Sequence, residues 1–322
     1  MSALDDLTAS LAKFRTAKRV SGASASYKKD NPTEYAKVIA YLDGGARPTG
    51  VTTDMGMALL LEEDARRSLV VPPPPPSGTY KLSENFDTFY ASRWEKNWHW
   101  DGDAYHTTNE AQAYRDANVA ISNGVLSLTA KREATTDFQG RAVPYTSGMI
   151  QSGGKSWDSS TSTYVTPPQE LFTYTYGLLE ARMKMPRGAG LWTALWLCDA
   201  LSVNTKCYRE IDILEWLGRE PNVAHFNYHW WDLNQHVGSS WTTPVSFGDD
   251  FHVYGLDWRA GKLVWYVDGV ERWRYEGSGV PSTPHYIIAN LTVGSAASWG
   301  GAPDASTVFP QSLLIDYIQI SP

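Results

Sequence analysis

The sequence predicts an all-β protein, an antiparallel β-sandwich, for most of its 322 residues. Three observations point to this fold. After Gly78, several short segments alternate apolar with polar residues, glycine and proline separate these segments, and no long helical periodicity occurs. Successive side chains of a strand point to opposite faces of its sheet, so a period of two is expected of a half-buried strand. Many such strands with frequent turn signals favour a sandwich.

Each expected strand can be placed along the chain. In order, they lie in the segments "GVLSLTAKRE", "YGLLEARMKM", "FHVYGLDW", "KLVWYVDGVERWRY" and "SLLIDYIQI". The fourth segment contains "VDGV" at 267–270, and Asp-Gly is a strong signal for a two-residue hairpin turn. We therefore expect this segment to form two strands joined by a tight turn.

The chain before these strands differs in composition. Helical spacing of apolar residues occurs in residues 1–70, and all 14 Trp and all seven His residues follow Pro76. Five consecutive prolines at 72–76 favour polyproline II, which is a stiff spacer. We expect a small helical N-terminal segment at 1–70, a proline-rich linker at 71–78 and a β domain at 79–322. The helical segment is either an appendage without chemistry or a module that docks to a larger assembly.

Composition argues against several classes of function. The net charge of −7 disfavours electrostatic binding to nucleic acid, which needs clustered Lys and Arg, and it favours a neutral polymer over an anionic one as substrate. No apolar run is long enough to span a membrane, and the acidic, amphipathic start "MSALDDLTASLAKF" does not resemble a secretory signal. Cys198 and Cys207 are too few for a disulfide framework. They form one bridge if they lie on neighbouring strands, or they stay reduced.

The segment "REIDILEWLG" at 209–218 contains the main candidate for a catalytic site. Glu210 and Asp212 share a face of a regular strand, but Glu215 would point to the opposite face, into the core. A buried carboxylate without a partner is costly in free energy. One extra residue, a β-bulge near Ile213–Leu214, returns Glu215 to the face of the other two. The odd interval therefore predicts a bulged strand with three acids in one row.

A row of carboxylates suits hydrolysis of a glycosidic bond. Retaining glycosidases hold two carboxyl groups about 5–5.5 Å apart, one as nucleophile and the other as acid and then base. Asp212 would lie between the two glutamates, hydrogen-bonded to the nucleophile. Carboxylates this close do not all ionise easily, so we expect a raised pKa at Glu215, which then acts as the acid. An exposed acidic strand and a metal site are the alternatives.

Several longer segments extend this interpretation. "EIDILE" is followed by "NVAHFNYHWW", "FHVYGLDWRAGKLVWYVDGV", "ANLTVG" and "FPQSLLIDYIQI", and it is preceded by "YGLLEARMKMPRGAGLWTALWL". In this order they resemble glycoside hydrolase family 16, the β-jelly-roll endoglycanases, in the bulged Glu-x-Asp-x-x-Glu form of laminarinases and agarases. The resemblance covers roughly residues 80–322 and leaves 1–76 without a counterpart. It implies an antiparallel β-jelly-roll sandwich, a concanavalin A-like fold.

The resemblance also implies roles for individual residues. Glu210 corresponds to the nucleophile, Asp212 to its helper and Glu215 to the acid/base. The expected substrate-binding residues are Trp192, Trp196, His229 and Asn290, which match family positions near the cleft, and Trp216, which directly follows the acid/base. Core packing is the alternative for each Trp, since a large aromatic side chain serves either purpose.

Two family features concern the surroundings of this site. Many members bind one structural calcium ion away from the cleft, and by position its ligands would be Asp316 and backbone carbonyls near Asn85 and Gly124. An oxygen-only set suits a hard cation; a hydrogen-bonded Asp316 without metal is the alternative, and catalysis itself needs no cofactor. The segment 156–175 is longer than the usual family link, and because loops on a rigid scaffold carry specificity, we expect it to add or block a subsite.

As a whole, the resemblance implies an endo-acting, retaining β-glycosidase that hydrolyses laminarin-like β-1,3-glucan by double displacement. The same chemistry on mixed-linkage β-glucan or β-galactan is the first alternative. A polysaccharide-binding protein that no longer cuts is the second, although both glutamates are present. A virion-associated protein is the third, with the N-terminal segment as its anchor. In each case the polysaccharide partner is extracellular, while the location of the protein itself stays open.

Overall fold

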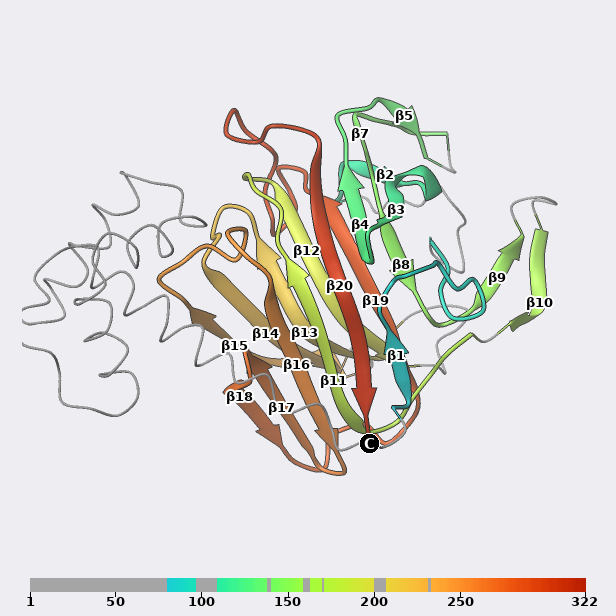
Figure 1. Ribbon diagram of the computed structural model, residues 1–322, viewed down its shortest axis with the longest axis vertical. Helices are drawn as coiled ribbons and strands as arrows, with labels where there is room; N and C mark the ends of the chain where they lie inside the picture. Colours follow the sequence, from blue (N-terminus) through green and yellow to red (C-terminus); the bar gives the residue numbers. More distant parts are fainter. Residues whose placement is uncertain are drawn as a thin grey trace, which may run out of the picture. The chain divides into compact units, whose positions relative to one another are not determined.

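A computed structural model describes residues 80–96, 109–137, 140–158, 163–169, 171–199, 207–230 and 233–322 (Figure 1). The predicted helical segment at 1–70 and linker at 71–78 lie outside these residues and stay predictions. In the described part of the chain, no helix has the length and apolar character needed to cross a membrane. Its strands are accompanied by a short 3-10 helix, η2 (Asp116–Asn118).

The larger of the two main sheets has eight strands. Its order is β18-β17-β16-β11-β20-β4-β3, and β1 also pairs with β20. All of these pairings are antiparallel. The strands are β1 (Leu82–Glu84), β3 (Val119–Ser122), β4 (Val125–Ala130), β11 (Gly177–Lys184), β16 (His252–Arg259), β17 (Lys262–Val267), β18 (Val270–Glu276) and β20 (Gln311–Ser321).

The second main sheet has six strands, also antiparallel throughout, in the order β15-β14-β13-β12-β19-β8. Its strands are β8 (Met149–Gln151), β12 (Leu191–Asp199), β13 (Arg209–Leu217), β14 (Val223–Trp230), β15 (Gln235–Thr242) and β19 (His285–Val293). The segment "REIDILEWLG" supplies β13, which lies in the interior of this sheet with β12 and β14 as neighbours.

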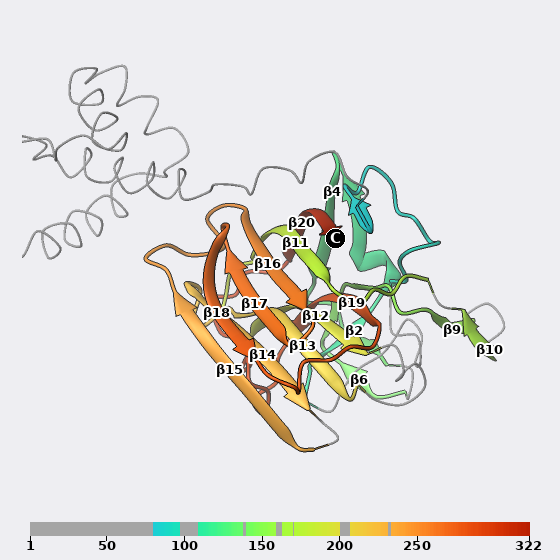
Figure 2. The same cartoon turned by 90° about the horizontal axis from the view of Figure 1, so that it is seen from below.

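A single hydrophobic core fills the space between the two main sheets, which form two layers in Figures 1 and 2. Leu179, Tyr254 and Trp265 enter it from the eight-stranded sheet, and Ile211 and Phe226 enter it from the six-stranded sheet. A hydrogen bond also links the two sheets across the core: Trp265 Nε1 donates to the backbone oxygen of Asp212 at 2.8 Å. The predicted antiparallel sandwich is therefore confirmed.

The alternating segments form strands at the expected places. They become β4, β11, β16, β17, β18 and β20, and alternate residues of β11 are fully buried. The predicted hairpin joins β17 to β18 through Asp268 and Gly269, which have φ angles of 53° and 72°. Two successive left-handed residues are what a type I′ turn requires, and glycine adopts this conformation without a steric penalty.

Three smaller strand pairs complete the described fold. β2 (Gln112–Tyr114) pairs in parallel with β7 (Tyr145–Ser147), and β5 (Thr135–Thr136) pairs with β6 (Ala142–Val143). The insertion at 156–175 contributes most of the third pair, in which β9 (Lys155–Asp158) is antiparallel to β10 (Thr163–Gln169). This pair stands apart from the two main sheets in both views (Figures 1 and 2), and its effect on substrate choice stays a prediction.

Candidate active site

Strand β13 carries the predicted bulge. Opposite β14, Asp212 pairs with Asn227 while Glu215 pairs with His225, so three steps along β13 match two steps along β14. On the other side, β12 pairs with Asp212 and with Leu214 through consecutive residues, which leaves Ile213 as the extra residue. The bulge shifts the alternation by one position, as the spacing of the acids predicted.

All three acids contact side chains from one face of β14. His229 Nε2 lies 3.4 Å from Asp212 Oδ2 and 3.9 Å from Glu210 Oε1. Asn227 Nδ2 donates a hydrogen bond to Glu215 Oε2 at 2.6 Å. His229 and Asn227 are two residues apart on a regular strand and share a face. We call this the carboxylate face of the six-stranded sheet.

Glu215 is the acid whose surroundings most favour protonation. Only 7% of the residue is exposed. Burial raises the pKa of its carboxyl group well above the usual range, and the charge of Asp212 raises it further, whereas the hydrogen bond from Asn227 lowers it. Trp192 Nε1 donates a second hydrogen bond to Glu215, to Oε1 at 3.2 Å. Two neutral donors thus hold a carboxyl group that tends to keep its proton.

Asp212 is buried between the other two acids along the strand. It is 3% exposed, and no hydrogen bond to its Oδ2 is formed by the described residues. Burial raises the pKa of Asp212 well above the usual range, and the charge of Glu210 adds to this effect. The Glu210 side chain is 19% exposed and so more accessible than Asp212. Of the two glutamates, Glu210 is therefore the less desolvated group, as a nucleophile should be.

Two tryptophans of β12 lie beside the acids. Trp192 contacts Glu215 as described, and Trp196 is the register partner of Asp212. Trp196 Nε1 donates to Asn290 Oδ1 at 2.8 Å, and Asn290 Nδ2 in turn donates to Tyr114 and Thr292. Asn290 is thus close to the site as predicted, but its polar atoms are engaged in holding the Trp196 ring. Sugar binding by Trp192, Trp196, His229 and Asn290 stays a proposal.

The expectation that Trp216 binds substrate was wrong. Its side chain is fully buried in the core cluster, and its Nε1 donates to the backbone oxygen of Pro221 at 3.1 Å. The physical reason is the alternation of the strand, which resumes after the bulge and directs Trp216 away from the face that holds Glu215. Trp216 is therefore a core residue without access to a substrate.

The sequence did not single out Trp299, which is 40% exposed. Its ring meets Trp192 edge-on with 5.7 Å between centroids, and it lies 4.9 Å from the ring of His225. His225 in turn approaches Glu220, with 3.3 Å between Nε2 and Oε2. The segment "GSAASWGG" at 294–301 held a usable signal, because a Trp among small residues has no apolar pattern that would bury it.

The predicted calcium ligands lie on neighbouring segments of the eight-stranded sheet. In the register of β20, Ile318 pairs with Glu84, next to Asn85, while Ile315 pairs with Leu126, near Gly124. Asp316, however, forms a 2.6 Å ion pair with the Arg182 guanidinium. This cation occupies the one carboxylate of the set, whereas calcium takes six to eight oxygen ligands. Structural calcium stays a prediction, and no part of the chemistry depends on it.

The carboxylate face combines one accessible acid with one buried, proton-retaining acid on the same strand. This is the division of roles that acid/base and nucleophilic chemistry at an acetal carbon requires. Along β12, Trp192 and Trp196 lie on either side of Ala194, the residue opposite Glu215, and aromatic rings are typical of sites for ligands with apolar faces. The arrangement is suited to cutting a glycosidic bond.

Comparison with known proteins gives a consistent picture. The family model described as "Glycosyl hydrolases family 16" matches residues 95–317. A curated relative, "Glucan endo-1,3-beta-glucosidase A1" of Niallia circulans, is 28% identical in an alignment 259 residues long that covers 73% of this chain and 35% of the relative. The chain therefore spans about a third of that relative's length. "Beta-glucanase" of Rhodothermus marinus is 28% identical in an alignment 249 residues long that covers 70% of this chain and 79% of that protein.

A solved structure agrees in fold. The catalytic domain of an endo-1,3-beta-glucanase (laminarinase) from Thermotoga petrophila RKU-1 superposes with a TM-score of 0.63 at 28% sequence identity. The superposition covers 75% of this chain and 96% of that domain. The jelly-roll sandwich of the described residues is thus shared with a structure of known activity.

Proposed function

This chain belongs to family 16 of the glycosyl hydrolases, and from this premise we propose that it is an endo-acting, retaining enzyme that hydrolyses β-1,3-glucan. The observation that carries the proposal is the bulge of β13, which sets Glu210, Asp212 and Glu215 against one face of β14. A stability requirement alone would not collect three carboxylates there, because each raises the cost of ionising the others.

The reaction follows from the roles assigned to the acids. The Glu210 carboxylate attacks the anomeric carbon, and as the glycosidic bond breaks, its leaving oxygen takes the proton of Glu215. Water then attacks the glycosyl–Glu210 ester, gives one proton to the Glu215 carboxylate and releases Glu210. Both carboxyl groups return to their starting protonation states, and the sugar keeps its anomeric configuration after two inversions.

The electrostatics support this assignment over its reverse. The raised pKa of Glu215, caused first by burial, keeps its proton available for the leaving oxygen. Asp212 is buried next to Glu210 along the strand, and its own pKa is raised by burial and by Glu210. A protonated Asp212 can donate a hydrogen bond to Glu210, which would stabilise its carboxylate before the attack and again as it leaves during hydrolysis of the ester.

The polymer is the finer part of the proposal. The names of the relatives include β-1,3-glucan and the broader term β-glucanase, so β-1,3-glucan is the first substrate to test. Trp192, Trp196 and Trp299 offer aromatic rings beside the acids, and His229 is a polar group within reach of both Glu210 and Asp212. A neutral glucan fits a chain whose net charge is negative.

The test is release of reducing ends from purified laminarin, curdlan, barley β-glucan, lichenan, xyloglucan, agarose and galactan. The full chain is compared with Glu210→Gln, which keeps the size of the side chain and removes the nucleophile. We expect cutting of laminarin by the wild type only. If only barley β-glucan or galactan is cut, that polymer is the substrate and β-1,3-glucan is not. Binding of a polymer without cutting of any would contradict the enzyme assignment.

A further inference from the structure

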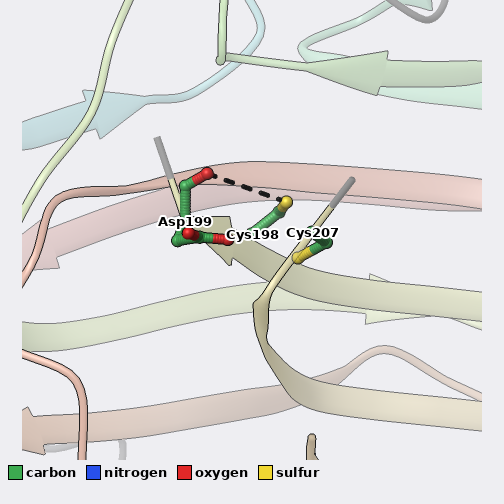
Figure 3. Close-up of side chains that lie close together, drawn as sticks. All are labelled: Cys198, Asp199 and Cys207. Atoms are coloured by element: carbon green, nitrogen blue, oxygen red, sulfur yellow. Dashed lines mark hydrogen bonds between the residues drawn. The ribbon is translucent and has the colours of Figure 1, made fainter. Parts of the chain in front are cut away.

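A second cluster of reactive side chains lies at one end of β12 and β13. Cys198 and Asp199 are the last residues of β12, and Cys207 comes two residues before the start of β13. Both cysteines are free thiols. The two sulfur atoms and a carboxylate oxygen of Asp199 all lie within 4.8 Å of one another. In Figure 3 the sulfur of Cys207 points toward the other two residues.

The Asp199 carboxylate is held in place from the other side. Its Oδ1 accepts hydrogen bonds from the backbone N–H groups of Tyr208 at 2.8 Å and Arg209 at 3.2 Å. Carboxylates that bind metal ions are usually oriented by hydrogen bonds of this kind. Asp199 is 3% exposed, so the carboxylate that lies beside the two thiols is buried.

Each of the two thiol groups donates a long hydrogen bond to a backbone oxygen. Cys207 Sγ donates to the backbone oxygen of Arg209 at 3.3 Å, and Cys198 Sγ donates to that of Asp199 at 3.9 Å (Figure 3). Burial raises the pKa of both thiols, so both are protonated at neutral pH. Two thiol groups thus lie beside one buried carboxylate, and their hydrogen bonds to backbone oxygens are long.

We infer that Cys198, Asp199 and Cys207 form a binding site for a soft divalent cation such as Zn²⁺. Thiolate and carboxylate are both established zinc ligands, at about 2.3 Å for sulfur and 2.0–2.2 Å for oxygen. Around a tetrahedral ion such ligand atoms are roughly 3.5–3.8 Å apart, so atoms that lie within 4.8 Å of one another need to approach by about 1.3 Å at most. Calcium and magnesium are excluded, because they prefer oxygen ligands alone.

Each thiol releases its proton to water when its sulfur binds the ion, and the Asp199 carboxylate binds without a proton change. The ion therefore brings two positive charges to three negative ligands. Cys207 is partly exposed, which gives the ion a route to the site and leaves a fourth position for water.

The position of this site gives it a structural consequence. Cys198 of β12 is the register partner of Glu210 of β13, so the two residues lie opposite each other on neighbouring strands. An ion bound by Cys198, Asp199 and Cys207 would tie the end of β12 to the chain just before β13. It would thus fix the part of β13 that presents Glu210. Melting of the whole domain should shift to a higher temperature when the ion is added, since a ligand that binds only the native state stabilises it.

The test uses cobalt as a spectroscopic probe for zinc. The full chain is kept in a phosphine reductant, so that both thiols are free, and is titrated with Co²⁺. We expect one equivalent to bind and to produce the near-ultraviolet sulfur-to-cobalt absorption that only thiolate ligands give, and we expect zinc to displace it. Cys198→Ser and Cys207→Ser should each lose this absorption and weaken binding by at least 10-fold, the lower limit for losing even a supporting group of a metal site.

Two further variants separate ligation from folding. Asp199→Asn keeps an oxygen that accepts from Tyr208 and Arg209 but loses the charge, so it should stay folded and bind cobalt more weakly. Glu210→Gln changes the other cluster of potential ligands, Glu210, Asp212 and His229, and should leave the sulfur-to-cobalt absorption unchanged because that cluster contains no sulfur.

Three outcomes would overturn the inference. One is wild-type protein with two free thiols that shows no sulfur-to-cobalt absorption in excess cobalt. Another is absorption that persists in both cysteine variants. The third is protein purified without reductant in which mass spectrometry finds Cys198 joined to Cys207, provided that the reduced form also binds no cobalt. The wild-type titration decides the matter even if a cysteine variant fails to fold.

Discussion

Two groups of charged side chains, one on each main sheet, differ in their burial and in their partners. On the eight-stranded sheet, Arg274 pairs with Glu271 at 2.6 Å, and Arg259 pairs with Asp257 at 2.6 Å. The arginines of these pairs are half exposed. On the six-stranded sheet, Asp212 and Glu215 are almost fully buried, and the hydrogen bonds to Glu215 come from the neutral side chains of Asn227 and Trp192.

This difference separates charges that are tolerated from charges that cost free energy. Exposed ion pairs gain little, because water screens them and two long side chains must be ordered. Buried carboxylates without cationic partners are expensive, and they persist where function needs them. Substitutions of the buried acids of the six-stranded sheet should therefore affect activity and stability in opposite directions, whereas substitutions of the exposed pairs named above should affect neither.

The largest expected effect comes from the two glutamates. Glu215→Gln should lower kcat by about 10²–10⁴-fold, the usual contribution of general acid–base catalysis, and Glu210→Gln should lower it at least as much because no covalent intermediate can form. Initial rates of reducing-end release from laminarin measure this. Asp212→Asn is the matched comparison and should lose less, since its carboxyl group forms no bond to the sugar. Wild-type rates in Glu210→Gln would contradict the roles assigned here.

The next effect concerns the pH profile. The hydrogen bond from Asn227 favours the charged form of Glu215 and so lowers its pKa. In Asn227→Ala this pKa should rise, and the alkaline side of the kcat profile should move to higher pH by about 1–2 units, which corresponds to the loss of a hydrogen bond to a charged group.

Asn227→Thr is the control for this shift, because a hydroxyl group can still donate to Glu215. Its profile should lie between those of the wild type and the alanine variant. An alkaline side that stays in place in Asn227→Ala would mean that Glu215 is not the group that titrates.

A smaller effect, of opposite sign, is expected on stability. Burial raises the pKa of Glu215 above 4.5 in the native state. The native state is therefore more stable at low pH, where Glu215 is protonated, and this stability is lost as the pH rises through the raised pKa. At neutral pH, Glu215→Gln should therefore raise Tm by roughly 2–4 °C, the shift that about 1 kcal/mol produces in a domain of this size.

Thermal unfolding at neutral and acidic pH tests this expectation. The gain should shrink as the pH falls from the raised pKa toward 4.5, the ordinary pKa of the group, and should be absent below 4.5, where both states are protonated. Glu276→Gln makes the same chemical change at an exposed residue of the eight-stranded sheet and should leave Tm unchanged. A destabilised Glu215→Gln would mean that this carboxylate stabilises the fold.

The smallest effect should come from the exposed pairs. Arg274→Ala removes contacts with Glu271 and Glu276, yet Tm should stay within about 2 °C and kcat within about 2-fold of the wild type. The same melting and reducing-end assays measure both. A loss as large as that of the buried residues would remove the distinction between the two sheets.

Local sequence patterns predict most of the strands and the bulge that positions the acids. Strands β11, β16, β17 and β20 follow from alternation, because a half-buried strand has only one simple pattern. The bulge of β13 follows from the cost of burying Glu215 in the core, which makes the odd interval informative. The family-specific order of the segments then extends the prediction from one strand to a jelly roll.

Other features depend on contacts that alternation does not contain. Trp216 was expected near the substrate because it follows Glu215, but the resumed alternation after the bulge buries it in the core. Trp299 lies in a loop, where no periodicity indicates which way a side chain points, and only the fold brings it to Trp192 and His225. The approach of Cys207 to Cys198 and Asp199 likewise depends on how β12 and β13 end.

The proposed function requires that the bulged strand β13 forms a retaining active site. Proton NMR during the first minutes of laminarin hydrolysis can show this, because the anomer of the new reducing end is recorded before mutarotation. We expect the β-anomer to appear first with the wild type and no product to form with Glu210→Gln. Initial release of the α-anomer would show inversion and would contradict the roles of Glu210 and Glu215.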